Sequence, residues 1–466
     1  MFVPKHVLRS PWVQAPGDRV CFAQLVGWRH AAAAVFWLSL VAAPHPAWAG
    51  QEVSAPGTGG PLTLQQVLDE ALARNPELIA LEREYDRARR APDTARGFEP
   101  PMFETQIWRW PINTLDPSKV DMYMFSMGQS LPGRGKRDSR AALSEATAAL
   151  AGASIEVRAR QIVDDVKQAW ADLYLVRKAI EVNRKTVTLL RQFADIASVK
   201  YATGSISQQD VLAGIVELSR LHEQLIVLEE QERLAAAVLN TLLDRVPETP
   251  VGLLAEPPDL GVLPPTAELQ ALALEHEPGL QVAALDTARA EAALAASIAE
   301  YKPDFRISGG YMLMPNMTDA WMASFGITWP GAPWSRKRLD ADKALAEAEV
   351  SASQARRRAA ENQVRLAVHR AWVRVGSAGA RLALIESSVL PQAEQTVAVS
   401  RVGYESDRGS FLALIDSQRV LLEAELDYYR ARAERAAAIA DLERVVGVDL
   451  AAPPSGTITT PGRQQP

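Results

Sequence analysis

The sequence predicts a mainly α-helical chain with a small β part, in which one order of elements occurs twice. The segment "ALARNPEL", residues 71–78, resembles "ALEHEPGL", residues 273–280, and Trp170 matches Trp372 at the same spacing. Apolar residues also follow a heptad pattern over stretches that are too long for an ordinary globular domain. Four short runs with alternating apolar and polar residues indicate strands. The chain is therefore predicted to be an internal duplication of long helical hairpins with β-hairpins.

The N-terminus has the pattern of a secretory signal peptide. An apolar run at residues 31–43 precedes the small-x-small sequence Ala47-Trp48-Ala49, which predicts a signal peptide at 1–49 and an N-terminal extension at 50–62. A buried core helix is the alternative. The only cysteine, Cys21, lies before the apolar run. The mature chain would then have neither disulfides nor thiolate metal sites.

The first repeat, 63–245, is expected to begin with a helix capped by Thr63 and broken at Pro76. A β-hairpin at 103–131, with strands at 103–110 and 121–131, precedes a long helical hairpin at 138–245. The segment 246–265 is rich in proline and cannot be helical throughout. The second repeat, 266–449, contains a β-hairpin at 304–329 and a helical hairpin at 335–447, and a disordered tail is predicted at 450–466.

The long helices have a heptad seam. From Ile155 to Tyr201 the apolar positions step alternately by four and three, and only Asn183 is polar; the second half repeats the pattern from Val364 to Val389. A period of 3.5 residues predicts left-handed supercoiling against a partner helix. A helix from 138 to 200 would be roughly 95 Å long. Such antiparallel hairpins form a rod or the wall of a tube.

Three of the four strand runs have one apolar face and one face of polar, small or methionine side chains, and the first run, 103–110, is ambiguous. This alternation suits an outer-membrane barrel with its apolar face outward, and soluble hairpins packed on a core are the alternative. Four strands cannot close a membrane barrel, because a bilayer tolerates no open sheet edge. Two copies would supply eight strands around a filled interior, and three copies would supply twelve strands around a lumen.

Composition and motifs argue against an enzyme. The net charge of −6 does not support nucleic-acid binding. The HExxH and G-x-S-x-G patterns are absent. The segment "GQSLPGRGKRDSR", residues 128–140, approaches a phosphate-binding loop, but Ser130 replaces its first glycine and Arg137 its hydroxyl residue. We therefore expect no catalytic residues, no cofactor and no nucleic-acid partner.

Four segments carry a resemblance to a known family: "LTLQQVLDEALARNPEL", "LPGRGKR", "YATGSISQQDVLAG" and "YESDRGSFLALIDSQRVLLEAEL". Over residues 62–449 the chain resembles the TolC-type outer-membrane efflux family, and "LPGRGKR" and "RNPEL" are most similar to its heavy-metal (CzcC/CusC-like) branch. The resemblance implies a homotrimer with a 12-stranded outer-membrane β-barrel and a periplasmic α-barrel. It implies export of substrates, heavy-metal ions in that branch, with a periplasmic adaptor (membrane fusion protein) and an inner-membrane RND-type pump. A type I secretion or drug-efflux duct of the same fold, and a non-conducting coiled-coil structural protein of the envelope, remain alternatives.

The junctions between strands and long helices are rich in basic residues. We expect these junctions at the membrane interface, where basic side chains contact outer-membrane lipid phosphates; a solvated basic turn is the alternative. The predicted junction residues are Pro132, Arg134, Lys136 and Arg137 in the first repeat, and Pro330, Arg336 and Lys337 in the second.

The turns of the helical hairpins are the ends farthest from the membrane. The resemblance implies that they close the duct and contact the adaptor through Tyr201, Gly204, Ser207, Gly409 and Ser410. It places Asp416 in an acidic ring, Asp210 and Tyr404 among residues that lock neighbouring hairpins, and Arg408 one residue from a locking arginine. Three converging carboxylates would attract cations. The alternative for Asp416 is a solvated helix residue.

Methionines gather in the predicted β-hairpins. Strand parity and direction put five of them on the lumen face near the extracellular end: Met122, Met124, Met312, Met314 and Met322. Thioethers are soft ligands that favour Cu(I). The alternative is that these flexible side chains only fill a constricted mouth.

Overall fold

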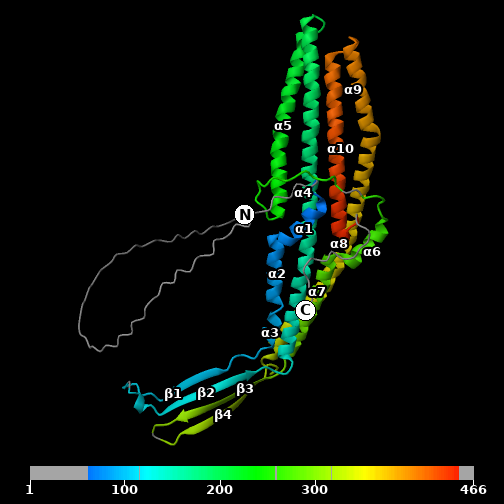
Figure 1. Ribbon diagram of the computed structural model, residues 1–466. Helices are drawn as coiled ribbons and strands as arrows, with labels where there is room; N and C mark the ends of the chain where they lie inside the picture. The colour runs from blue at the N-terminus through cyan, green and yellow to red at the C-terminus, as the bar shows by residue number, and fades with distance from the viewer. Residues whose placement is uncertain (1–60, 115, 258–259, 316, 451–466) are drawn as a thin grey trace, which may run out of the picture. The chain divides into compact units, whose positions relative to one another are not determined.

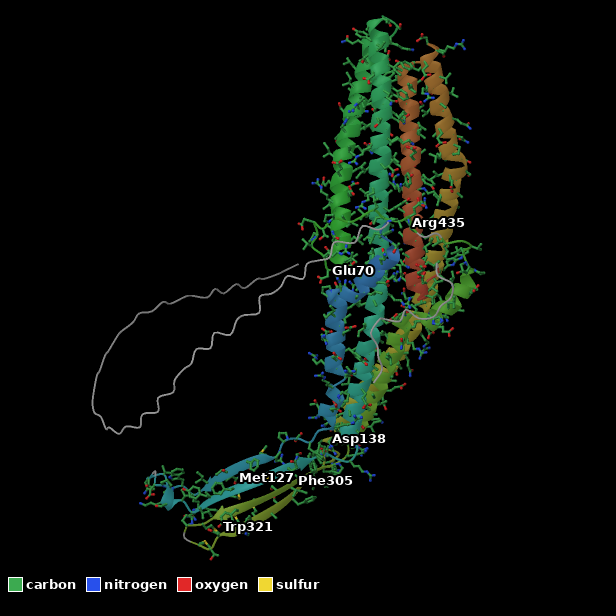
Figure 2. The ribbon with its side chains drawn as sticks, viewed as in Figure 1. Glu70, Met127, Asp138, Phe305, Trp321 and Arg435 are labelled. Carbon is green, nitrogen blue, oxygen red and sulfur yellow. The ribbon has the colours of Figure 1, made fainter. Side chains whose placement is uncertain are left out.

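In the computed structural model, the structure describes residues 61–114, 116–257, 260–315 and 317–450. The predicted signal peptide, nearly all of the N-terminal extension and all but the first residue of the predicted tail lie outside the described residues. The first run of elements is α1 (Leu64–Arg74), α2 (Pro76–Ala88), α3 (Ala91–Arg96), β1 (Met102–Trp108), the short 3₁₀ helix η1 (Pro117–Lys119), β2 (Met122–Leu131), α4 (Lys136–Ala202) and α5 (Gln208–Leu242). The second is α6 (Thr266–His276), α7 (Pro278–Ala299), β3 (Asp304–Leu313), β4 (Ala320–Thr328), α8 (Arg336–Leu384), the π-helical segment η2 (Ile385–Val389), α9 (Leu390–Glu405) and α10 (Phe411–Val446) (Figure 1).

Local sequence signals set the first helix boundaries. The Thr63 hydroxyl accepts a hydrogen bond from the Gln66 N–H, and the Gln66 side chain accepts one from the Thr63 N–H, as predicted. Asn75 separates α1 from α2, and Pro76 takes the first position of α2, where a missing N–H costs no helical hydrogen bond. The two repeats differ in that Pro92 opens a separate α3, whereas α7 continues for 22 residues.

The four strands form one antiparallel sheet in the order β1-β2-β3-β4. Gln106 pairs with Met124, Met124 with Met312, and Ser308 with Ser324. Because directly paired residues share a face, the even-numbered residues of all four strands lie on one face and the odd-numbered residues on the other. This register settles the face of β1, which its own sequence left ambiguous: Phe103 joins the apolar face.

The long helices confirm the predicted seam over most of its length. Helix α4 has 67 residues, and Ile162, Leu173 and Leu190 are buried along it. The last positions of the two predicted seams, Tyr201 and Val389, are exposed instead. Tyr201 stands at the end of α4. Val389 lies in the π-helical segment just before Pro391. Proline has no N–H to donate to a carbonyl of the preceding turn, so the regular hydrogen-bond pattern is interrupted and the helix face is rotated there.

Two cores stand at equivalent places in the repeats, and a third joins the hairpins. Trp170 belongs to the first and Trp372 packs against the second, as their equivalent positions suggest. The third core, near the hairpin turns, combines residues of α4, α5, α9 and α10, among them Phe193, Tyr404 and Phe411. Among the described helices, none combines the length and the apolarity that a membrane-spanning helix requires.

Candidate gate, junction and sheet sites

The turns of both helical hairpins have the same backbone geometry. Gly204 follows α4 with φ +76°, and the Ser205 N–H donates to the Lys200 carbonyl over 2.9 Å. Asp407 takes the corresponding place after α9 with φ +59°, and the Arg408 N–H donates to the Gly403 carbonyl over 2.9 Å. Helices commonly end in such a left-handed residue, usually glycine. Aspartate tolerates this backbone conformation less well than glycine, so Asp407 is an unusual residue at this position.

Asp407 and Tyr404 of the second hairpin contact Lys200 of the first. Lys200 Nζ, from α4, donates to the Asp407 carboxylate and to the Tyr404 carbonyl, each over 2.6 Å, and lies 4.5 Å from the centre of the Tyr404 ring. The Tyr404 ring is 2% exposed and lies 5.3 Å from that of Phe411. Burial raises the pKa of Tyr404, and the charges of Asp210 and Asp407 raise it further. Tyr404 therefore joins the two hairpins of one chain.

The other predicted gate residues lie at the surface of the same region. Asp210 accepts hydrogen bonds from the Ser207 hydroxyl (2.8 Å) and N–H (3.2 Å) and so completes the capping box of α5, in which Ser207 is the N-cap. The Asp416 side chain is 77% exposed, with Arg419 Nη1 at 3.7 Å. Arg408 is exposed, and its backbone N–H makes the turn hydrogen bond. The predicted adaptor-contacting residues are all exposed: Tyr201, Gly204, Ser207, Gly409 and Ser410.

Sequence reasoning missed the pairs that connect the hairpins. Besides Lys200 and Asp407, Arg419 of α10 donates to Glu217 of α5 through Nε over 2.9 Å. These hydrogen bonds lower the pKa of the Glu217 carboxyl. Self-comparison could have marked Asp407, because it stands where the first repeat has Gly204. It could not have shown that Glu217 and Arg419 meet.

The junction of β2 with α4 corrects one prediction. The Lys136 side chain is 1% exposed, and its ammonium lies 2.9 Å from Asp304 Oδ2 and 3.2 Å from Glu300 Oε2. The Gly133 N–H also donates to Asp304, over 2.7 Å. An ammonium enclosed by two carboxylates cannot face lipid phosphates, so Lys136 is a structural lysine that ties the first repeat to the second.

The other basic residues of the junctions are more accessible. The Arg137 guanidinium stacks 3.7 Å from the centre of the Phe98 ring and donates to the Arg96 carbonyl. Arg134, Arg336 and Lys337 are exposed, and the prolines of the two junctions, Pro132 and Pro330, are partly buried. Contact of the exposed residues with lipid stays a prediction.

A cavity of about 270 Å³ lies between α1, the middle part of α4 and the C-terminal end of α10. Its wall includes Asp164, 3.1 Å from Arg444 Nε, and Glu443, 2.6 Å from Lys167 Nζ. Burial raises the pKa of both carboxyls despite their cationic partners. Within the described residues no group of three or more His, Cys, Asp or Glu side chains is arranged to hold a metal ion.

The sheet brings four of the five predicted methionines onto one face. Met124 and Met312 are direct cross-strand partners, Met122 lies two residues before Met124 on β2, and Met314 directly follows β3, where its N–H donates to Asp319. Met322 of β4 shares this face, opposite Gly310. All five stand near the end of the sheet away from the start of α4.

Comparison with known proteins agrees with this architecture. The family model described as "Outer membrane efflux protein" matches residues 269–448. The cobalt-zinc-cadmium resistance protein CzcC of Cupriavidus metallidurans is 23% identical over 392 residues, covering 83% of this chain and 90% of the relative. Two similar solved structures are the outer-membrane channel OprN (TM-score 0.69, 18% identity, 84% of this chain and 91% of the other) and CusC (TM-score 0.69, 14% identity, 85% and 96%).

The predicted fold class is thereby confirmed, and the family is one of channels rather than enzymes. The family model falls on the second repeat, while the relative and the solved structures extend over both. Helical hairpins, a four-stranded sheet and these matches agree with one another: residues 269–448 match the outer membrane efflux protein family, and the chain over both repeats is similar in fold to outer-membrane channels.

Proposed function

We propose that three copies of this chain form a closed duct that exports heavy-metal ions, working with a periplasmic adaptor and an inner-membrane RND-type pump. The observation that carries the proposal is the open sheet. Its outer strands, β1 and β4, each have one partner among the described strands, so each leaves a row of backbone groups unpaired. Unpaired backbone groups are not tolerated in hydrocarbon.

The sheet also has a face suited to lipid. Phe103, Phe325 and Trp321 are 75%, 68% and 81% exposed on the odd-numbered face. Trp329 and Trp334 are exposed just beyond β4, near its junction with α8, where an aromatic girdle at the membrane surface is expected. The opposite face carries Ser126, Gly128 and Arg306, which suits a water-filled interior. Three chains supply the twelve strands that leave such an interior open.

The substrate class is supported by the name of the curated relative, a cobalt-zinc-cadmium resistance protein. The exposed Asp416 adds an independent argument. Three copies brought together around an axis would present three carboxylates at the periplasmic end, which favours cations over anions. The gate in this proposal consists of Asp416, Asp210, Tyr404 and Arg408, and the adaptor contacts the exposed tips.

Cysteine cross-linking tests the assembly. Thr105→Cys in β1 is combined in turn with Ala323→Cys, Phe325→Cys or Ile327→Cys in β4, all on the apolar face. Oxidation in outer membranes should produce covalent trimers for at least one combination, and each single variant serves as its control. Products that stop at dimers, or that extend beyond trimers, would contradict the closed three-chain ring.

Tolerance of the host tests the substrate. Deletion of the gene should lower tolerance to cobalt, zinc or cadmium salts, and the intact gene should restore it. A loss of drug tolerance alone would favour the drug-efflux alternative. Loss of a secreted protein alone would favour type I secretion. Reconstituted trimers that never conduct would favour a structural role in the envelope.

A further inference from the structure

We infer that the even-numbered face of the sheet carries a soft-metal site, built from five methionine thioethers, that binds Cu(I) or Ag(I). The inference rests on the proposed function in one respect: this face must line the lumen for the site to lie on the export path. The site is called the methionine ladder below and consists of Met122, Met124, Met312, Met314 and Met322.

The register brings the ladder together. Met124 of β2 and Met312 of β3 are directly opposite, so their Cβ atoms are about 4.5–5.5 Å apart. Met122 lies two residues before Met124 on the same face of β2, and Met314 directly follows the last residue of β3. Met322 of β4 is opposite Gly310, which makes it a diagonal neighbour of Met312. Three adjacent strands therefore contribute thioethers to one patch.

The side chains have the reach and the room to converge. Methionine has three rotatable bonds before its methyl group, so sulfurs from neighbouring rungs can approach one ion. Met124 is only 8% exposed, which places its side chain among its neighbours rather than in open solvent. Gly310, Ser126 and Gly128 lie on the same face and carry no bulky side chain that would separate the ladder residues.

The placement is difficult to explain by packing alone. The apolar face of the sheet uses phenylalanine, tryptophan, isoleucine and leucine, with Met127 as its methionine. The ladder instead lies on the face that holds mainly serine, glycine, Gln106 and Arg306, with Trp108 opposite Met122 as its aromatic residue. A large apolar side chain gains little from a wall that faces water, so the thioether sulfur is the property that distinguishes these five residues.

The chemistry selects soft monovalent ions. Thioether sulfur prefers Cu(I) over the harder divalent ions, which favour nitrogen and oxygen donors, and Ag(I) is soft in the same way. Thioethers are also uncharged, so they hold a cation less firmly than thiolates do. Rungs of weak sites near an exit allow an ion to move from one to the next and leave.

Silver titration of the whole protein tests the site directly. Full-length protein, purified from outer membranes in detergent, is titrated with Ag(I), and the bound silver is counted after gel filtration. In the test variant the five ladder residues are changed to leucine. In the control variant Met102→Leu, Met127→Leu and Met317→Leu alter methionines outside the ladder. Methionine and leucine are close in volume, so the fold should tolerate each change.

We expect the ladder variant to bind silver at least tenfold more weakly than the parent, while the control variant binds it normally. A double variant, Met124→Leu with Met312→Leu, should have a silver affinity between those of the parent and the five-residue ladder variant. X-ray absorption of the bound silver in the parent should show sulfur neighbours. Equal affinity in the parent and the ladder variant, or an equal loss in the control variant, would overturn the inference.

Conductance keeps this test separate from the proposed function. A parent protein that binds silver but never conducts would reject the duct and retain the ladder. Where the ladder variant assembles and conducts normally, host tolerance to silver or copper should fall while tolerance to cadmium stays at the parent level. Unchanged silver and copper tolerance would overturn the placement of the site on the export path.

Discussion

Lys200 Nζ lies 2.6 Å from Asp407 Oδ1 and thereby joins the tips of the two helical hairpins of one chain. The Asp407 side chain is 74% exposed, so its ion pair with Lys200 contributes little to overall stability. Its position makes it more important for conformation than for stability. An opening movement of one hairpin against the other has to break this contact.

We predict that Asp407→Asn raises the resting conductance of the reconstituted channel. Asparagine tolerates the left-handed backbone of this position, so the variant removes the charge and preserves the turn. Single-channel recording in planar bilayers measures the effect. Glu425→Gln is the matched control, because the Lys185–Glu425 pair also connects α4 to the second hairpin, through α10, but lies away from the tips. Equal resting conductance in both variants would mean that the tip contact does not hold the channel closed.

Asp416→Asn is predicted to lower the preference of the channel for cations. Its carboxylate is 77% exposed and only partly balanced by Arg419 at 3.7 Å, so in a trimer it would add three negative charges near the constriction. Reversal potentials in a salt gradient report the preference. Glu405→Gln removes another exposed carboxylate from the tip region and should have the smaller effect. A larger shift from Glu405→Gln would show that Asp416 faces away from the pathway.

Lys136→Met should destabilise the protein by about 2–3 kcal/mol. Removal of one partner from a fully buried ion pair typically costs about 3–5 kcal/mol, and the cost is lower here because Asp304 and Glu300 stay about one-third exposed. The apparent midpoint of thermal unfolding in detergent measures the loss. Lys337→Met, at the exposed junction of the second repeat, should change stability by less than about 0.5 kcal/mol. Similar losses in both would argue that charge near the membrane, rather than the buried pair, is responsible.

Two buried carboxyls should change stability with pH in opposite directions. Burial raises the pKa of Asp164, so its ionisation as the pH rises through that value penalises the folded state. Hydrogen bonds from Arg419 lower the pKa of Glu217, so its contribution is present above the unfolded pKa and is lost as the pH falls through the folded one. Asp164→Asn should therefore stabilise the protein more at pH 7 than at pH 3, and Glu217→Gln should destabilise it more at pH 7 than at pH 3, because both unfolded pKa values lie between these two pH values.

Free energies of unfolding in denaturant, followed by helical circular dichroism at the two pH values, provide the measurement. Both variants keep the size of the side chain, and each serves as the control for the other. If the stability differences of both variants from the parent changed in the same direction between pH 3 and pH 7, the two carboxyls would not have the environments described above.

Much of the architecture could be predicted from the sequence, because it depends on local and periodic signals. The capping box at Thr63 marks the first helix, and the heptad steps along α4 predict its length and buried face. Alternation indicates the strands, and self-comparison finds the second copy of each element. These patterns depend on residues that are close in sequence, so they can be identified without knowing what each face contacts.

The tertiary structure alone decided which residues meet across the repeats. The basic segment at the first junction reads as one solvated or lipid-facing patch, yet Lys136 is buried because β3 brings Asp304 beside it. The face of β1 followed from its pairing with β2, since a single strand with mixed residues has no preferred side. Lys200 meets Asp407, and Glu217 meets Arg419, because the two hairpins pack against each other. Such contacts join residues about 200 positions apart, and only the packed chain brings them within reach.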